Sequence, residues 1–338
     1  MERVVDPLTS KKSGSEVSVL IALAVLIAAL VVAPFYVYPQ FVMQALCFAL
    51  FACAFNLLIG YVGLLSFGHA LYFGWASYVC AHVVKIGTIS IPYWPGSWIV
   101  IPVPPLTPEL GILVGAATGA VLGLIAGSLA IRRQGIYFAM ITLALAQMMY
   151  FFALQAKFTG GEDGIQGVPR GKLLGLVDLA DPTTMYVFVV AVFLAGFLFI
   201  YRIIHSPFGE VLKAIRENEA RAISLGYKTD RYKLMAFVLS TTLTGIAGAI
   251  KAIVMQIASL SDVVWQMSGE VVLMTLVGGL GTIFGPVIGA FIILTMQYKL
   301  AAFGEWVTVI QGAIFVACVL LFRRGVAGEI ANLLRVKL

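Results

Sequence analysis

Residues 40–60 read QFVMQALCFALFACAFNLLIG, and Asp, Glu, Lys and Arg are absent from them and from the whole range 17–84. A transmembrane helix needs about 20 consecutive, mostly apolar residues, so this range is long enough for about three crossings of a bilayer. A soluble helix carries a polar face along its length, and no such face runs along residues 40–60. This segment therefore predicts a helix that lies in a membrane.

The composition extends this prediction to the rest of the chain. Of its 338 residues, 61% are hydrophobic and 11% are charged, whereas soluble domains carry about 25% charged residues. A membrane β-barrel would alternate apolar and polar residues in segments of about ten, but the apolar runs here are continuous. Further runs without charge span 110–131, 134–156, 182–201, 234–250, 271–298 and 306–322. We therefore expect an all-α, polytopic membrane protein and not a soluble protein with a very large core.

The apolar runs predict about ten transmembrane helices. The expected spans are 18–38, 40–60, 64–84, 108–131, 135–155, 183–204, 234–255, 263–281, 283–301 and 306–322. The run 18–33 could also be a signal peptide, but a long segment precedes it and no small-x-small cleavage site follows, so we interpret it as a retained span. All four cysteines lie in apolar runs and are expected to be small buried hydrophobes: Cys47, Cys53, Cys80 and Cys318.

The distribution of charge predicts the orientation. The positive-inside rule places short loops rich in Lys and Arg in the cytoplasm. With the N-terminus inside and an even number of spans, the C-terminus is also inside, and 16 of the 22 basic residues fall on that side. The other six, Lys251 among them, are expected outside or at outer helix ends. The expected parts are cytoplasmic tails at 1–17 and 326–338, a membrane domain at 18–325 and a cytoplasmic loop at 205–232. The net charge of +6 then reflects orientation among the lipids of a bacterial inner membrane, and no basic face remains for a nucleic acid.

Residues 202–233 form the one long cytoplasmic segment, and they carry helix signals. Ser206 followed by Pro207 predicts a helix start, because Ser caps the first turn and Pro is tolerated there. Gly226 is typical of a helix end. Between them, apolar residues recur at helical spacing opposite the charges: Phe208, Val211, Leu212, Ile215, Ala222, Ile223 and Leu225. We expect one or two short amphipathic helices, with a break near Asn218–Glu219.

Two interpretations of this amphipathic segment remain open. It could anchor the chain on the membrane surface, or it could dock into another protein. A pure anchor favours Lys and Arg on its polar face, whereas this face also carries Glu210, Glu217 and Glu219. Mixed charge suits a groove on a protein better than an anionic lipid surface, so docking is favoured.

Three motifs in this segment carry a family resemblance. They are Lys213-Ala214-Ile215-Arg216-Glu217-Asn218-Glu219, Leu225-Gly226 and Arg231-Tyr232-Lys233-Leu234. They resemble the EAA loop of ABC importer permeases, in the form found in branched-chain amino acid permeases, although Arg221 stands where a second alanine is common. Two further stretches, 56–70 and 135–165, are similar to the same family. The likeness covers about 40–325 and is greatest to the longer of the two permease subunits of such an importer.

The resemblance implies a type II ABC importer permease fold with related halves. It implies as partners a second, homologous permease subunit, two ABC ATPases, and a periplasmic or lipid-anchored solute-binding protein. The residues it assigns to the ATPase-coupling loop are Ser206, Pro207, Phe208, Gly209, Lys213, Ile215, Arg216, Glu217, Asn218, Glu219, Ala220, Ala222, Leu225 and Gly226. The chain has no Gly-x-x-x-x-Gly-Lys-Ser/Thr phosphate loop. We therefore expect no cofactor, metal or catalytic residue on this chain, with ATP and Mg on the partner ATPases.

Two glycine-rich breaks interrupt the apolar runs and predict the translocation pathway. Breaks in membrane helices are tolerated where they are buried in protein or line a cavity, and in transporters they often mark the substrate site. The candidates are Gly63, Ser66, Gly68, His69, Glu270, Gly279 and Gly281. An alternative stays open for the glycines, which is tight helix packing through small residues. His69 could likewise be a packing residue rather than part of a gate.

Several functions remain in competition at this point. The first is a permease for branched-chain or related amino acids. The second, within the same family, is a permease for urea, short amides or other small carboxylates. The third is an ion-coupled secondary transporter, which would need charged residues near the membrane midplane; it leaves the amphipathic segment unexplained. A membrane enzyme would need a catalytic constellation, whereas His69, His82 and His205 lie in three separate places.

Overall fold

The computed structural model describes residues 7–85, 88–94, 97–102, 106–133, 135–173, 175, 177–304, 306–321 and 325–333. The described helices are α1 (Pro7–Tyr36), α2 (Pro39–Tyr61), α3 (His69–Lys85), α4 (Pro108–Ala130), α5 (Ile136–Gln155), α6 (Pro182–Ile204), α7 (Pro207–Glu217), α8 (Glu219–Ser224), α9 (Thr229–Met255), α10 (Trp265–Gly278), α11 (Gly285–Leu300), α12 (Trp306–Leu321) and α13 (Gly325–Leu333). Short strands are β1 (Thr88–Trp94), β2 (Ser97–Pro102), β3 (Ile165–Gln166), β4 (Lys172–Leu173), β5 (Val177–Asp178) and β6 (Ile257–Ala258).

The all-α, polytopic architecture is confirmed. Each expected span contains one helix, and the order of spans matches α1 to α6 and α9 to α12. Within the described residues, six helices are long and apolar enough to cross a membrane, namely α1, α2, α4, α5, α6 and α9. The helices α3, α10 and α11 are shorter than the expected spans, because the glycine-containing connections next to them take up residues that the spans included. The related halves stay a prediction.

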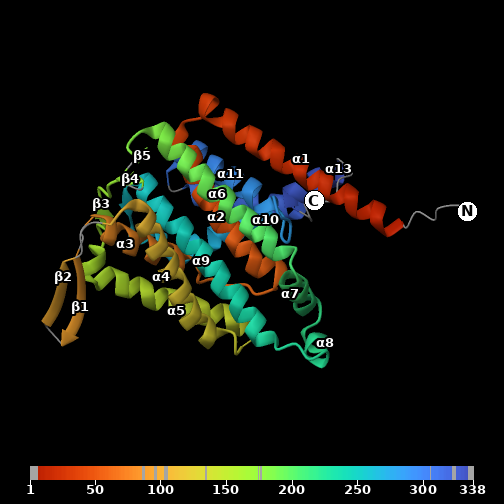
Figure 1. Ribbon diagram of the computed structural model, residues 1–338, viewed down its shortest axis with the longest axis horizontal. Helices are drawn as coiled ribbons and strands as arrows, with labels where there is room; N and C mark the ends of the chain where they lie inside the picture. Colours follow the sequence, from red (N-terminus) through yellow and green to blue (C-terminus); the bar gives the residue numbers. More distant parts are fainter. Residues whose placement is uncertain are drawn as a thin grey trace, which may run out of the picture.

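Two helices form the centre of the bundle. In an 18-residue apolar segment of α2, 89% of the residues are buried inside the protein, and in the corresponding segment of α9 the share is 78%. In the peripheral helix α1 the share is only 6%. Figure 1 shows α2 and α9 running through the middle, with α1 along one side. The outward apolar side chains of α1, α4, α5 and α6 are exposed, as expected for surfaces that face lipid.

Small residues bring α4 and α9 into close contact. A Cβ added to Gly119 would lie 2.4 Å from the carbonyl oxygen of Thr241, and one added to Gly123 would lie 1.9 Å from Thr241 Oγ1. No side chain larger than hydrogen fits at either place. This is the packing through small residues that is typical of membrane helices.

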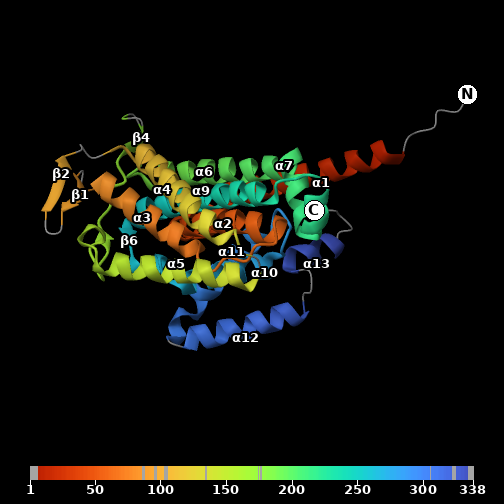
Figure 2. The same ribbon diagram turned by 90° about the horizontal axis from the view of Figure 1, so that it is seen from below.

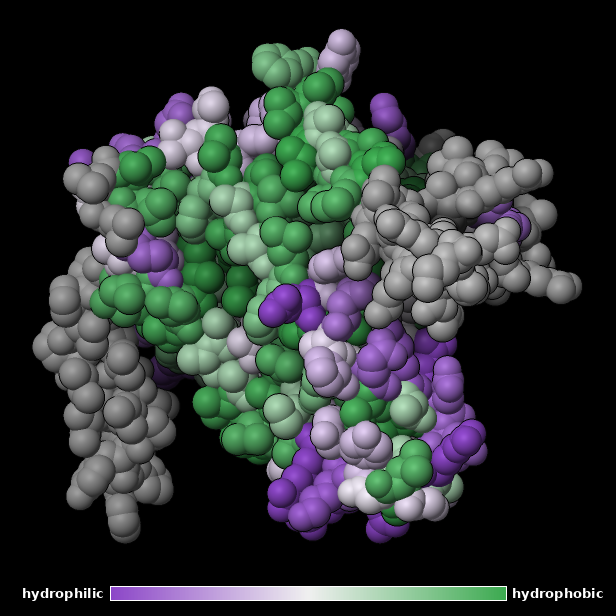
Figure 3. Space-filling view, turned by 45° about the vertical axis from the view of Figure 1, so that its right-hand side comes forward, coloured by the Kyte–Doolittle hydropathy of each residue, from purple (hydrophilic) through white to green (hydrophobic). Residues whose placement is uncertain are grey.

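The strands and the short amphipathic helices lie at opposite ends of the bundle. Figures 1 and 2 both draw β1 to β5 at one end and α7, α8 and α13 at the other. Figure 2 also shows α12 to one side of the bundle. On the face drawn in Figure 3 the described residues of the middle are mostly apolar, and many hydrophilic residues gather at the lower edge, at the height where Figure 1 draws α8. We call the end with the strands the strand end and the other the α7 end.

At the strand end, the loop between α5 and α6 is fixed against the end of α9. Strands β3 and β6 pair antiparallel, with Ile165 opposite Ala258. The Val168 amide donates to the Gln256 carbonyl at 3.0 Å, and Arg170 donates to the Val254 carbonyl at 3.2 Å. These bonds satisfy carbonyls at the C-terminus of α9 that have no partner within the helix.

Asp181 begins α6 at the same end. Its carboxylate accepts hydrogen bonds from the Thr184 amide at 2.9 Å and the Thr184 hydroxyl at 2.8 Å. Both bonds favour the charged form and hold the pKa of Asp181 below its ordinary value. Pro182 follows as the first helical residue, which is where a missing amide proton costs nothing.

Candidate functional site

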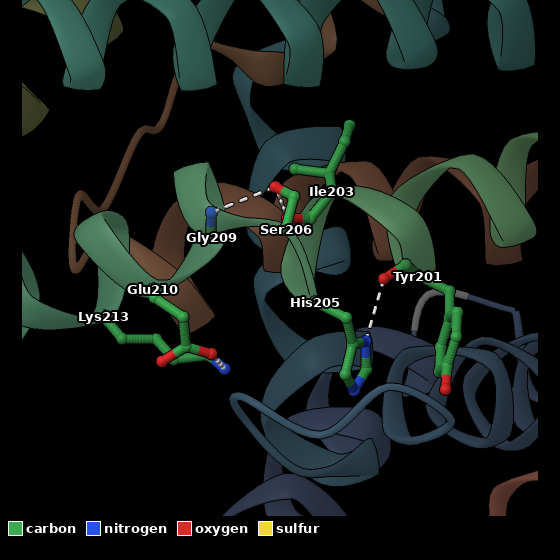
Figure 4. Close-up of polar contacts among 7 residues, drawn as sticks. All are labelled: Tyr201, Ile203, His205, Ser206, Gly209, Glu210 and Lys213. Carbon is green, nitrogen blue, oxygen red and sulfur yellow. Dashed lines mark hydrogen bonds and ion pairs between the residues drawn. The ribbon is translucent and has the colours of Figure 1, made fainter. Parts of the chain in front are cut away.

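Helix α7 starts at the predicted Ser206–Pro207 pair. Ser206 Oγ accepts from the Gly209 amide at 3.3 Å and donates to the Ile203 carbonyl at 2.6 Å (Figure 4). Gly209 allows the close turn from α6, because a Cβ there would lie 2.3 Å from the carbonyl oxygen of Ile204. The cap and the glycine together fix the angle at which α7 leaves α6.

One face of α7 is buried and the other is exposed. Leu212 is 0% and Ile215 is 3% exposed, and the Phe208 ring stacks on Tyr232 of α9 at a centroid distance of 5.7 Å. On the outer face, Lys213 and Glu210 form an ion pair at 2.8 Å (Figure 4). The prediction that α7 is amphipathic, with an apolar face opposite the charged one, is therefore confirmed.

The break predicted near Asn218–Glu219 is confirmed at Asn218. Its backbone is extended, with φ −156° and ψ 97°. The Asn218 amide donates to the Ala214 carbonyl and closes α7. Its side-chain oxygen accepts from the Arg221 amide at 3.0 Å and caps α8. One residue thus ends one helix and begins the next, which sets α8 at an angle to α7.

Glu219 ties α8 to the start of α9. Its carboxylate accepts a hydrogen bond from Thr229 Oγ1 at 3.1 Å and pairs with Lys233. The Lys233 side chain is only 3% exposed, so the pair is shielded from water on one side. Ala222 of α8 is buried beside it.

The end of α8 leaves apolar side chains uncovered. Gly226 has φ +89°, its amide donates to the Ile223 carbonyl, and the Tyr227 amide donates to the Ala222 carbonyl. This pattern is a Schellman motif and confirms the predicted helix end. Around it, Ile223 is 54% and Leu225 is 70% exposed.

Arg216, at the C-terminal end of α7, reaches inward to both glycine-rich breaks. Its Nη1 donates to the Gly60 carbonyl at the end of α2. A Cβ on Gly63 would lie 3.3 Å from Arg216 Cγ, and a Cβ on Gly281 would lie 3.2 Å from Arg216 Nη1. The cavity at this place has a volume of about 400 Å³ and is lined by Tyr61, Lys213, Arg216, Glu217 and Gly281.

Asn56 joins α2 to the turn between α10 and α11. Its Nδ2 donates to the Thr282 carbonyl at 2.8 Å, and its Oδ1 accepts from the Gly281 amide at 3.1 Å. Gly279 and Gly281 have φ +123° and +74°, so the turn depends on residues without a side chain. The two breaks, far apart in sequence, therefore meet in one place.

The remaining pathway candidates of the first break pack against other helices. Ser66 Oγ accepts from the Gly68 amide at 3.3 Å, and the Phe67 amide donates to Thr142 Oγ1 of α5 at 3.2 Å. A Cβ on Gly68 would lie 2.5 Å from the Thr142 carbonyl oxygen. This part of the break is in close contact with α5.

His69 lies inside the bundle and not on an open path. It is 0% exposed, and the rings of Phe55, Tyr72 and Phe237 surround it within 5.7 Å. Its Nε2 is 3.0 Å from Ser240 Oγ, which itself donates to a carbonyl of α2. Because the serine has one proton, the histidine is the donor in this contact. The geometry favours the packing interpretation of His69.

Glu270 is separated from these residues along α10. It is partly buried, and its carboxyl is hydrogen-bonded to Gln297 of α11. Ser268, two residues earlier, accepts from the Ala70 amide at 2.8 Å and links α10 to α3. The sequence identified Glu270 by its charge but did not single out Ser268, because a hydroxyl in a membrane helix carries little signal.

The polar residues that sequence reasoning missed are mainly partners of backbone groups. Asn56 is recognisable in the sequence as one of the few polar residues at membrane depth, a placement that often marks function, but it was not among the pathway candidates. A buried ion pair between Lys251 of α9 and Asp262 was also missed. Its atoms are 2.6 Å apart, and the side chains are 8% and 3% exposed, whereas the sequence placed Lys251 simply at an outer helix end.

Comparison with known proteins gives one family and several relatives. Residues 37–319 match the family described as branched-chain amino acid transport system / permease component. Over 284 residues the chain is 26% identical to the high-affinity branched-chain amino acid transport system permease protein LivM of Salmonella typhimurium and 25% identical to that of Escherichia coli. It is 30% identical over 203 residues to the ribose import permease protein RbsC of Bacillus subtilis, covering 53% of this chain and 58% of that protein. No solved structure matches.

The matches to the two LivM proteins cover 77% of this chain but only 63% of each relative. The chain therefore spans less than two thirds of the length of these curated relatives.

Proposed function

The chain belongs to the family of branched-chain amino acid transport system permease components, and from this premise we propose that it is one permease subunit of an ATP-driven importer. It is a multi-pass membrane protein. In the proposal it forms half of the path for a branched-chain or related amino acid, in a bacterial inner membrane, with both termini and α7–α8 in the cytoplasm. A second, homologous permease supplies the other half. ATP and Mg bind to two partner ATPases, and a periplasmic or lipid-anchored protein delivers the solute.

The observation that carries this proposal is the way in which α7 and α8 are fixed in place while apolar side chains of α8 and its C-terminal end stay exposed. Two side-chain caps, a Schellman motif and the Glu219–Lys233 pair hold a helix pair rigidly while Ile223 and Leu225 stay exposed. A helix held in this way with uncovered apolar side chains is suited to docking into a groove of another protein. Its mixed charges, with Glu210 beside Lys213, support a protein surface over a lipid surface.

Replacement of Leu225 tests the docking role. Burying a leucine side chain is worth about 1.5–3 kcal/mol, so Leu225→Asp should weaken ATPase binding by at least about tenfold. The measurement is co-purification of ABC ATPases with the tagged chain from membranes, together with ATP-dependent uptake of labelled leucine. Leu225→Met should retain both, because it keeps an apolar side chain of similar volume.

A matched control is Arg133→Gln, which alters an exposed residue in the connection between α4 and α5. It should leave both assembly and uptake unchanged. Normal ATPase binding and uptake in Leu225→Asp would contradict the docking role. Failure of the unaltered chain to bind any ABC ATPase would overturn the proposed function itself.

The substrate class needs its own test, because the relatives include permeases named for branched-chain amino acids and for ribose. We propose branched-chain amino acids since the family match spans 37–319. Calorimetry with the solute-binding protein that co-purifies with the complex decides the matter. Binding of leucine, isoleucine or valine supports the proposal. Binding of urea, a short amide or a sugar, with none of these three amino acids, refutes it.

A further inference from the structure

Arg216 is exposed as a residue, but its guanidinium joins α7 to the end of α2 by a hydrogen bond. The carbonyl of Gly60 belongs to the last turn of α2, where carbonyls have no partner within the helix. Arg216 donates to this carbonyl, and a cation at a helix C-terminus is also favoured by the helix dipole. Lys213, one turn earlier, pairs instead with Glu210 on the surface. Of the two basic residues of α7, Arg216 therefore binds a backbone group of α2, whereas Lys213 binds a carboxylate of α7 itself.

Gly63 and Gly281 leave room for the Arg216 side chain because neither carries a side chain. A Cβ on Gly63 would come within 3.3 Å of Arg216 Cγ, and a Cβ on Gly281 within 3.2 Å of Arg216 Nη1. Both distances are tighter than ordinary van der Waals contact, so a side chain on either glycine would crowd Arg216. The arginine thus lies against the break after α2 and the turn between α10 and α11 at the same time.

Asn56 joins α2 to the turn between α10 and α11 by two hydrogen bonds, so a shift of one place would pull on the other. It accepts from the Gly281 amide and donates to the Thr282 carbonyl, while Thr282 Oγ1 donates to the Gly279 carbonyl at 2.7 Å. A displacement of Gly281 is therefore passed to α2, and a displacement of the end of α2 is passed to the turn.

We propose that Arg216 is a positioning residue that transmits movement of α7 to both glycine-rich breaks through its contacts with Gly60, Gly63 and Gly281. The inference rests on the proposed function, because it assigns the consequence of ATPase docking at α7 and α8. Arg216 need not bind the ATPase to act in this way. Its loss separates ATP hydrolysis from transport while leaving the docking helices in place.

The experiment uses the assembled complex in proteoliposomes, with ATP hydrolysis and uptake of labelled leucine measured in parallel. The variants are Arg216→Lys, which keeps the charge but loses the planar fork, and Arg216→Gln. The matched control is Arg132→Lys, at an exposed arginine in the connection between α4 and α5. Arg216→Gln should keep ATPase binding and hydrolysis within about twofold and lower the leucine taken up per ATP by about tenfold, since a hydrogen bond from a charged group is lost.

A purely structural role would give a different result. Loss of ATPase binding, or equal loss of hydrolysis and uptake, would overturn the proposal, and so would unchanged uptake per ATP in both Arg216 variants. A complex whose unaltered form binds ABC ATPases but takes up no leucine would refute the proposed substrate and not the role of Arg216.

Hydrogen exchange on the purified full chain tests the contact without any transport. The amides of Gly281 and of residues 62–64 should exchange about tenfold faster in Arg216→Lys and Arg216→Gln than in Arg132→Lys. Exchange at β3 and β6 at the strand end should not change. Equal exchange at Gly281 in all variants would overturn the inference even where a variant assembles poorly.

Discussion

The two ends of the bundle are held together in different ways. At the strand end, backbone pairing of β3 with β6, the Arg170 contact to α9 and the ion pair of Lys251 with Asp262 join the loops to the core. At the α7 end, side chains make the connections: Arg216 donates to the Gly60 carbonyl, and Ser206 accepts from the Gly209 amide (Figure 4).

This difference suggests that the two ends resist displacement to different degrees. Backbone ladders and a buried ion pair have one favourable geometry and resist displacement. The contact of Arg216 with the end of α2 is a single side-chain hydrogen bond to a carbonyl, and a long side chain can follow a moving helix more easily than a backbone ladder can. In an importer, the α7 end would then be the adjustable part and the strand end the fixed frame.

The largest effect is expected from Lys251 and Asp262. Lys251→Met should destabilise the protein by about 3–5 kcal/mol, because removal of one partner leaves an uncompensated buried charge. The double variant Lys251→Met with Asp262→Leu should recover most of this loss, since apolar replacement of a buried pair is often neutral. Equilibrium unfolding in detergent micelles measures the difference. Native stability in Lys251→Met alone would show that the pair does not fix the strand end.

An intermediate effect is expected from Asn56 at the α7 end. Asn56→Leu leaves the Gly281 amide and the Thr282 carbonyl without their partner, at about 1–2 kcal/mol each. Unfolding should therefore be easier by about 2–4 kcal/mol, with faster hydrogen exchange confined to the turn between α10 and α11.

The control for this variant lies on the same helix. Gln44→Leu replaces a partly buried amide of α2 and should change stability much less. Equal destabilisation by the two variants would mean that the loss reflects a polar-to-apolar change in α2 in general and not the junction of the two breaks.

The sequence predicted the helices of this fold well because their signal is physical and local. Charge-free runs define the spans, and Ser206, Asn218 and Gly226 mark helix ends by backbone chemistry that needs no distant partner. For the same reason, the amphipathic face of α7 was predicted correctly.

Contacts between distant segments could not be derived in this way. Nothing in the sequence near Arg216 indicates that it meets Gly60, because the pairing depends on how α2 and α7 pack. Lys251 was placed at a helix end, but its partner Asp262 lies beyond a turn whose geometry is set by Ser259 and Asp262 together. For His69 the sequence left a packing residue and a gate residue both open, and the surrounding aromatic rings, which come from distant segments, favour packing.

The smallest effect is expected from the surface pair of Glu210 and Lys213. Their side chains are 67% and 37% exposed, and exposed pairs at this helical spacing contribute about 0.2–0.5 kcal/mol, which salt screens further. Glu210→Gln should therefore lower the midpoint of thermal unfolding by an amount close to the experimental error of the measurement. Glu219→Gln, which removes the charge facing the buried Lys233, should lower the midpoint clearly in the same assay. If the two variants behaved alike, burial of Lys233 would not strengthen the link between α8 and α9.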